Sequence, residues 1–182
     1  MDMKLAAALY LALATAANAQ GLDGVALEGD MRKLVVHDAP KEVSAAPMQN
    51  PEGETATLSD WSGKHVLLNF WATWCAPCRE EMPSLDALQT AMGGEAFEVV
   101  TLATGRNSVE GIEDFFAEVG VETLPIWLDP KQGIARDMAV LGLPITVLID
   151  PEGREVARLT GDADWNAPEA RAVIEEWTGA GS

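Results

Sequence analysis

Short, nearly uninterrupted apolar runs divide this chain into regularly spaced segments. His65–Trp71 is almost continuously apolar, which is typical of a strand buried on both faces of a sheet. Other short apolar runs predict strands at Phe97–Ala103, Leu124–Leu128 and Ile145–Ile149. Glu155–Thr160 follows a strong turn signal and is predicted to pair back on the strand before it. These runs indicate one sheet with His65–Trp71 as a central strand.

Helical spacing of apolar side chains fills the intervals between these runs. One helix is predicted to begin at the cysteine pair, with Pro77 in its first turn, and to end at Gly93. Ser108 is the expected cap of a second helix. Ile134–Val140 predicts a short third helix, and Pro168 opens a final amphipathic helix.

This alternation predicts an α/β fold with a central mixed sheet and helices on both faces. We expect the folded domain to span residues 46–182, with Glu54–Leu58 as a short strand near its start. The preceding residues 20–45 are polar and mixed. They indicate a flexible lead-in with at most one edge strand, at Arg32–Val36.

The first residues have the pattern of a secretory signal peptide, predicted to cover residues 1–19. Lys4 supplies a positive charge, Leu5–Ala17 is almost unbroken apolar sequence, and Ala17-Asn18-Ala19 is a cleavage pattern. The apolar segment is shorter than the roughly 20 residues that span a bilayer, although an uncleaved membrane anchor is the alternative. The pattern predicts export, into a bacterial periplasm where disulfide chemistry operates.

The charge of the chain narrows the choice of partners. With 182 residues, of which 48% are hydrophobic and 23% charged, the sequence suits one well-packed globular domain. Its net formal charge of −17 argues against a nucleic-acid partner, because phosphates require clusters of Lys and Arg. A solvated acidic surface that keeps the protein monomeric explains this charge, and selection for basic partners is the alternative.

The two cysteines are the candidate chemistry. Cys75 and Cys78 are the only cysteines, so a disulfide scaffold or a four-thiolate metal site is excluded. Their spacing favours a redox centre. The alternatives are an inert structural disulfide or half of a zinc site, which would need further ligands from His37, His65 or carboxylates.

Two longer motifs carry a family resemblance. The stretch from Asn69 to Pro83 reads NFWATWCAPCREEMP, and the stretch from Gly142 to Asp150 reads GLPITVLID, followed by Gly153. With these motifs the chain resembles the thioredoxin superfamily, and within it the exported TlpA/ResA-type thiol-disulfide oxidoreductases. The resemblance covers roughly residues 46–178. It implies a thioredoxin-like fold with an extra strand and helix inserted between the CxxC helix and the cis-proline.

The resemblance also assigns roles at the cysteine pair. Cys75, at the helix N-terminus, is expected as the attacking thiolate, and Cys78 as the resolving thiol. Pro144 resembles the cis-proline that faces the motif, and Leu143 would offer backbone groups to an extended substrate. For substrate binding we also expect Trp74 as an exposed apolar platform, and the uncharged pair Ala76 and Pro77 beside the reactive sulfur.

Glu81 is the further catalytic candidate. It matches an acidic position in TlpA/ResA-like proteins, where a buried carboxylate could raise the thiol pKa and relay a proton. Asn69 stands where cytosolic thioredoxins carry a buried Asp, and its amide cannot ionise, which strengthens the assignment of Glu81. The alternative is a solvated carboxylate favoured by the helix dipole.

The leading hypothesis is a periplasmic enzyme that reduces specific protein disulfides. The resemblance implies apocytochrome c or a copper-site disulfide of cytochrome oxidase as substrates, and a membrane thiol-electron transporter as the source of electrons. No glycine-rich phosphate loop indicates a nicotinamide, so no cofactor and no metal are expected.

Other functions remain as alternatives on the same fold. One is a general disulfide oxidant or isomerase, and another is a Cu(I)-handling module, although the chain lacks a supporting Met/His cluster. Peroxiredoxin chemistry is disfavoured because Ala72, not Thr, lies three residues before Cys75.

Overall fold

Strand β4 (His65–Trp71) lies in the middle of one mixed sheet. The structure, a computed structural model, describes residues 21–22 and 25–180, so the predicted signal segment 1–19 lies outside the described residues. The sheet has eight strands in the order β1-β8-β7-β4-β5-β6-β2-β3. Every residue of β4 after His65 is buried, because both faces of the strand are covered. The prediction of a central buried strand is confirmed, with the same bounds.

The other strands continue the sheet on both sides of β4. Parallel pairing joins β4, β5 and β6, whereas β7 is antiparallel to β4, β8 to β7, and β1 to β8. In this register Asn69 of β4 lies beside Thr101 of β5 and Thr146 of β7. The bounds are β1 (Leu34–Glu42), β2 (Met48–Gln49), β3 (Thr55–Ala56), β5 (Phe97–Thr104), β6 (Ile126–Asp129), β7 (Ile145–Ile149) and β8 (Arg154–Thr160).

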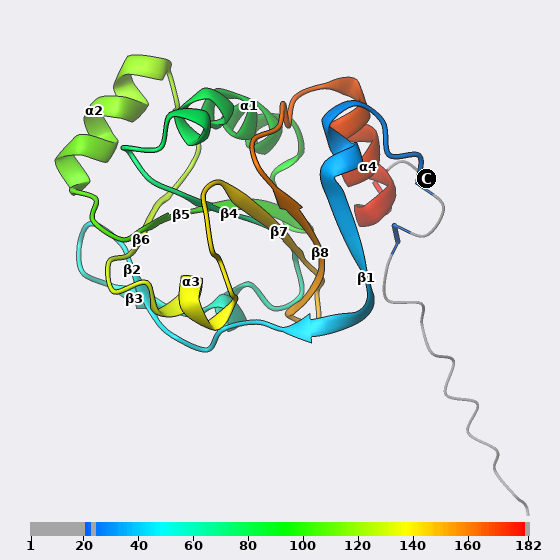
Figure 1. The fold of residues 1–182 in the computed structure, drawn as a ribbon, viewed down its shortest axis with the longest axis horizontal. Helices are drawn as coiled ribbons and strands as arrows, with labels where there is room; N and C mark the ends of the chain where they lie inside the picture. Colours follow the sequence, from blue (N-terminus) through cyan, green and yellow to red (C-terminus); the bar gives the residue numbers. More distant parts are fainter. Residues whose placement is uncertain (1–20, 23–24, 181–182) are drawn as a thin grey trace, which may run out of the picture.

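Helices cover both faces of the sheet, as predicted. The α-helices are α1 (Ala76–Met92), α2 (Val109–Val119), α3 (Gly133–Asp137) and α4 (Pro168–Thr178), and the 3-10 helices are η1 (Gly29–Lys33) and η2 (Leu58–Trp61). Figure 1 shows α1, α2 and α4 on one face and α3 on the other. Between α1 and Pro144 the chain forms β5, α2, β6 and α3, which includes the extra strand and helix expected there. Among the described residues, no helix is long and apolar enough to cross a membrane.

Two hydrophobic cores hold these layers together. On the first face, Leu85 of α1, Phe115 of α2 and Val173 of α4 are buried in one cluster against the sheet. Trp71 of β4 belongs to this cluster, where its ring stacks on that of Phe116 with centroids 5.6 Å apart. The second face buries a separate cluster that includes Leu68, Phe70, Ile134 and Met138. Because β4 contributes side chains to both cores, its position is fixed, and so is the start of the segment that follows it.

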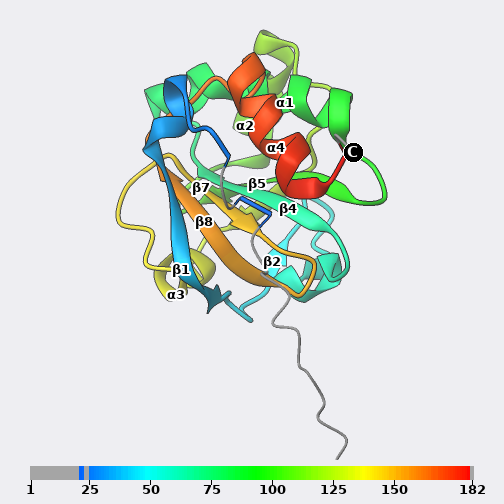
Figure 2. The same cartoon turned by 90° about the vertical axis from the view of Figure 1, so that its right-hand side faces the viewer.

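The N-terminal segment is more ordered than the sequence predicted. We expected a flexible lead-in over residues 20–45, but η1 packs on α4, and β1 pairs with β8 at the edge of the sheet (Figure 2). The reason is that two apolar side chains in this polar stretch, Met31 (0% exposed) and Leu34 (4%), enter the first core. The packed part of the domain therefore begins before residue 46.

Short elements depart from the predictions for local reasons. The strand expected at Glu54–Leu58 contracts to β3, because Thr57 and Asp60 form a capping box that starts η2. The helix expected at Ile134–Val140 ends at Asp137. Soon after that end, Ala139 has a φ of 52°, which no α-helix continues through.

The buried position of Met31 gives a stability test. We expect Met31→Ala to lower the free energy of unfolding by about 2–4 kcal/mol, because it removes a fully buried side chain and leaves a cavity. Val35→Ala is the matched control, since Val35 is 61% exposed and its change should stay within about 0.5 kcal/mol. Urea unfolding measures both. Equal midpoints for the two variants would show that this segment does not pack on the domain.

Candidate active site

The cysteine pair lies where β4 leads into α1. Cys75 is the N-cap of α1, and its Sγ accepts a hydrogen bond from the backbone N–H of Cys78 at 3.4 Å. The two residues form a disulfide. Pro77 lies in the first helical turn, where its missing N–H breaks no helical hydrogen bond. The free N–H groups and the dipole at this end of the helix therefore favour a negative charge on Cys75.

The two sulfur-bearing residues differ in access to solvent. Both cysteines belong to the first core, but Cys75 is 6% exposed and lines a surface pocket, whereas Cys78 is 0% exposed and does not line it. A substrate can therefore reach Cys75 first. Cys78, three residues further along the helix, can reach only the sulfur of Cys75. This asymmetry is the one expected for an attacking Cys75 and a resolving Cys78.

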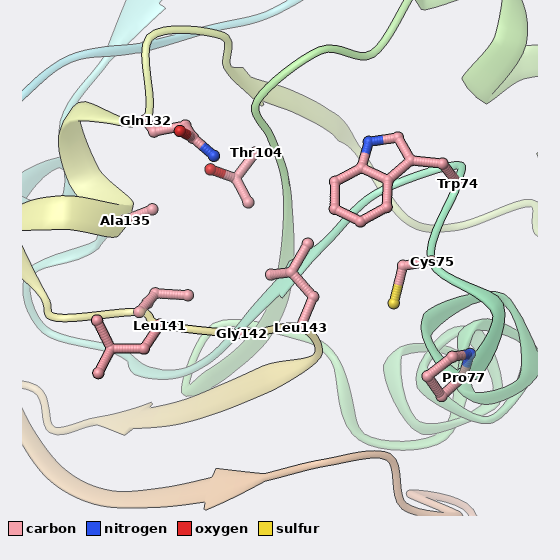
Figure 3. Close-up of a pocket in the computed structure, with 10 residues that line it drawn as sticks. Trp74, Cys75, Pro77, Thr104, Gln132, Ala135, Leu141, Gly142 and Leu143 are labelled. Carbon is pink, nitrogen blue, oxygen red and sulfur yellow. The ribbon is translucent and has the colours of Figure 1, made fainter.

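The pocket beside Cys75 has a volume of about 360 Å³ and carries no charged side chain. Figure 3 shows Trp74 and Cys75 on one side, Gln132 and Ala135 on the other, and Leu143 between them. Its walls come from the start of α1, the end of β5, α3 and the loop before β7. The lining residues are Trp74, Cys75, Pro77, Thr104, Gln132, Ala135, Val140, Leu141, Gly142 and Leu143.

The structure brings most of the predicted substrate-binding residues to this pocket. Trp74 is 65% exposed, and Pro77 and Leu143 also line the pocket. Ala76 is exposed but is not a lining residue. The peptide bond between Leu143 and Pro144 is cis, as the resemblance implied, and Pro144 is buried.

Six residues that line the pocket were not among the site residues predicted from the sequence: Thr104, Gln132, Ala135, Val140, Leu141 and Gly142. Leu141 is 95% exposed, which is unusual for a large apolar side chain, although its position before the Gly-Leu-Pro motif gave a signal that was not used. Thr104 is the last residue of β5, and Gln132 is the N-cap of α3. Gln132 has a φ of 54°, a left-handed conformation that no sequence pattern indicated.

Glu81 is buried behind the cysteines. Its side chain is 3% exposed, and the carboxylate accepts hydrogen bonds from Asn69 Nδ2 at 2.7 Å and from Ala163 N at 3.3 Å. Burial raises the pKa of Glu81 to about 7, although the hydrogen bonds from Asn69, Ala163 and Trp165 oppose the shift. Residues three apart on a helix are neighbours, so Glu81 lies next to Cys78. The solvated alternative is therefore wrong for this carboxylate.

Trp165 is a further residue that the sequence did not assign to the site. Its indole Nε1 donates a hydrogen bond to Glu81 Oε2 at 3.3 Å, and its ring is fully buried. No motif marks Trp165 as functional, because it lies in the loop between β8 and α4, far from the cysteine pair. Only the tertiary contact between this loop and α1 reveals it.

Other charged residues near the motif face away from the thiols. Arg79 pairs with Glu118 of α2 at 3.1 Å and stacks over the ring of Phe115, so its charge is directed toward α2. Neither histidine is at the motif, since His37 bonds to Glu155 and His65 packs on Trp177. Within the described part of the chain, no group of three His, Cys, Asp or Glu side chains could hold a metal ion.

The sequence matches known proteins of the expected kind. Residues 36–156 match the AhpC/TSA family. Thioredoxin-like protein YneN of Bacillus subtilis (strain 168) is 42% identical over 101 residues, which cover 56% of this chain and 59% of YneN. Thiol-disulfide oxidoreductase ResA of the same strain is 35% identical over 124 residues, which cover 68% of this chain and 66% of ResA. The chain thus spans 59% to 66% of the length of these relatives.

A solved structure agrees with these matches. The fold matches the crystal structure of a thiol:disulfide interchange protein DsbE from Chlorobium tepidum, with a TM-score of 0.66 and 28% sequence identity. The match covers 78% of this chain and 99% of the chain in that structure. The predicted resemblance and the thioredoxin-like fold are therefore confirmed. The chain combines the fold of these proteins with the CxxC disulfide at the end of β4.

The indole donor of Trp165 gives a test of the site. We expect Trp165→Phe to raise the pKa of Glu81, because the ionised carboxylate loses a hydrogen bond. One such bond corresponds to a rise of roughly half a pH unit to one. The midpoint is read from the carboxyl 13C signal of Glu81 in the oxidised protein.

The matched control is Trp177→Phe. Trp177 is also buried on the first face, but its ring contacts His65 and Phe97 rather than Glu81. The control should leave the Glu81 midpoint unchanged. An equal midpoint for wild type and Trp165→Phe would show that the indole does not stabilise the carboxylate.

Proposed function

The chain belongs to the AhpC/TSA family of thioredoxin-like proteins, and from this we propose that it is an exported thiol-disulfide oxidoreductase that reduces protein disulfides. One observation carries the proposal. Cys75, at a helix N-terminus and on the wall of a surface pocket, lies in front of a fully buried Cys78 and a buried Glu81 with a pKa of about 7. These are the nucleophile, the resolving thiol and the proton acceptor that two successive thiol exchanges need.

The first exchange takes place in the pocket. The Cys75 thiolate attacks one sulfur of the substrate disulfide, so a mixed disulfide forms and the other substrate sulfur leaves as a thiolate. The N–H of Cys78 and the dipole of α1 stabilise the attacking thiolate. The extended segment of the substrate can pair with the backbone of Leu143 across the pocket.

The second exchange releases the substrate. Cys78 gives its proton to Glu81 and attacks Cys75 Sγ, which forms the Cys75–Cys78 disulfide and frees the second substrate thiolate. The substrate gains two electrons and the enzyme loses two. Because the pKa of Glu81 is about 7, its carboxylate can accept this proton near neutral pH and later lose it. The structure contains the oxidised enzyme that this step produces.

The surroundings of the thiols favour the reducing direction. A strong oxidant stabilises its reduced thiolate, which requires positive charge or strong donors around it. Here Ala76 and Pro77 between the cysteines are uncharged, and Arg79 is paired with Glu118. A negative charge on Glu81 opposes a thiolate at Cys78 next to it. These effects outweigh the single N–H bond to Cys75, so the dithiol gives up its electrons readily.

The proposal extends to the cellular location, the electron donor and the substrates of this activity. The pattern in residues 1–19 supports export to the periplasm, where an oxidised enzyme must be reduced again from the membrane side. A membrane thiol transporter is the electron donor that we propose. Cysteine pairs of apocytochrome c or of a copper site in cytochrome oxidase are the candidate substrates, and the enzyme acts as a monomer.

The redox potential tests the proposed direction. We expect a potential below about −180 mV for the Cys75–Cys78 couple, measured by equilibration with glutathione or dithiothreitol buffers. Glu81→Gln should raise this potential, because removal of the negative charge makes the buried thiolate easier to form. A potential near about −120 mV would instead assign the protein to the disulfide oxidants.

The exposed apolar side chain of Leu141 at the pocket allows substrate binding to be tested. We expect Leu141→Ala to lower kcat/KM for reduction of insulin about fivefold, which corresponds to roughly 1 kcal/mol of contact with a protein substrate. Turnover of a small disulfide such as oxidised glutathione should not change. Val35→Ala, an exposed apolar position on β1, is the control and should affect neither substrate. Equal losses on both substrates would place Leu141 in the chemistry rather than in protein recognition.

A further inference from the structure

The carboxyl group of Glu81 is surrounded by hydrogen-bond donors. Among the described residues, Oε1 accepts from Asn69 Nδ2 at 2.7 Å, and Oε2 accepts from Ala163 N and Trp165 Nε1, each at 3.3 Å. Donors of this kind suit the ionised carboxylate. The neutral acid has an O–H of its own, which must find an acceptor because an unpaired buried donor is unfavourable.

Asn69 is the partner of Glu81 that can change from donor to acceptor. A backbone N–H and an indole N–H only donate, whereas an amide side chain carries a donor and an acceptor on one rotatable group. Asn69 is 0% exposed. Its Nδ2 makes two hydrogen bonds, to Glu81 and to Thr146 Oγ1 at 2.9 Å. Its Oδ1 is buried without a hydrogen-bond partner among the residues that the structure describes.

We propose that the side-chain amide of Asn69 reverses when Glu81 takes up a proton. A half-turn about the Cβ–Cγ bond exchanges the places of Oδ1 and Nδ2. Oδ1 then accepts from the Glu81 O–H at the place where Nδ2 now donates. The Thr146 hydroxyl rotates and donates to the same Oδ1, since a hydroxyl can serve as donor or acceptor.

The reversal gives each state of Glu81 a matching partner. With the carboxylate ionised, Asn69 donates to it, and with the carboxyl group neutral, Asn69 accepts from it. In the enzymatic step, which rests on the proposed function, the proton passes from Cys78 Sγ to Glu81 and leaves a thiolate beside a neutral acid. In each orientation one polar atom of the Asn69 amide makes two hydrogen bonds and the other makes none. The number of hydrogen bonds alone therefore favours neither orientation.

Several charged groups face Glu81 from the neighbouring elements. On α1 this group is Glu80, since Cys78 is in the disulfide and carries no charge. The loop after β8 and η1 contribute Asp162, Asp164, Asp30 and Lys33. Asp162 adds to the raised pKa of Glu81. The 2.8 Å pair between Lys33 and Asp30 raises the pKa of Lys33 and lowers that of Asp30. Lys33 and Asp30 therefore both titrate away from neutral pH. A change of the Asn69 signals near neutral pH is therefore assigned to the titration of Glu81.

Nuclear magnetic resonance of the oxidised protein tests the proposal. The Glu81 carboxyl 13C signal and the Asn69 side-chain 15N and 1H signals are followed from about pH 5 to about pH 9. We expect the Asn69 15N shift to have the same midpoint as the Glu81 13C shift. Nuclear Overhauser contacts from the Asn69 amide protons to Thr146 should be present above this midpoint and lost below it. No thiol takes part, so the result is independent of the redox activity.

Glu81→Gln is the control variant. It keeps the size and burial of the side chain but cannot change its protonation state, so the Asn69 signals should no longer depend on pH. Contacts between Asn69 and Thr146 that stay constant through the whole pH range in wild type would overturn the proposal. A pH-dependent change that persists in Glu81→Gln would overturn it as well, since another group would then drive it.

Discussion

The burial of one carboxyl group, that of Glu81, is the constraint on which the site depends. Removal from water raises the pKa of Glu81 to about 7, and hydrogen bonds from β4 and from the loop after β8 limit this rise. That loop must therefore be held against α1. Ser84 holds it, since its Oγ accepts from Trp165 N at 3.0 Å and donates to the backbone oxygen of Glu81 at 2.7 Å. On the outer side Asp30 of η1 accepts from Asp164 N at 3.2 Å, so the N-terminal segment also supports the loop that contacts Glu81.

The order of strands connects this carboxyl group to the substrate pocket. Strand β7 begins directly after the cis peptide bond that ends the pocket wall at Leu143. The register of β7 against β4 then places Thr146 beside Asn69, within hydrogen-bond distance. A short piece of chain thus supplies both the backbone that faces a substrate and a partner of the amide that contacts Glu81. Two hydrogen bonds, from Asn69 Nδ2 to Thr146 and to Glu81, therefore connect this strand to the buried carboxyl group.

Elements that depend on local capping or on the periodic spacing of apolar residues could be predicted from the sequence. The run His65–Trp71 and the helix that starts at the cysteines follow from hydrophobic spacing and capping, and both are confirmed. The N-terminal strand was underestimated because only a few apolar side chains, among them Leu22, Met31 and Leu34, are buried in an otherwise polar stretch. The positions of Trp165 and Gln132 at the site could not be predicted from the sequence, for a different reason. Their roles depend on contacts between loops far apart in the chain, and no periodicity or motif encodes such contacts.

A single ionisable acid behind the disulfide has a physical advantage over two. Asn69 Nδ2 and Glu81 Oε1 are 2.7 Å apart and both side chains are buried, so two carboxyl groups at these positions would repel each other strongly if both ionised. Their titrations would be coupled, and one pKa would move far from neutral pH. An amide at position 69 avoids this repulsion and gives the carboxylate a donor instead. It leaves one group, with a pKa of about 7, to exchange the proton of Cys78. The amide is therefore part of what makes Glu81 suitable for proton transfer at neutral pH.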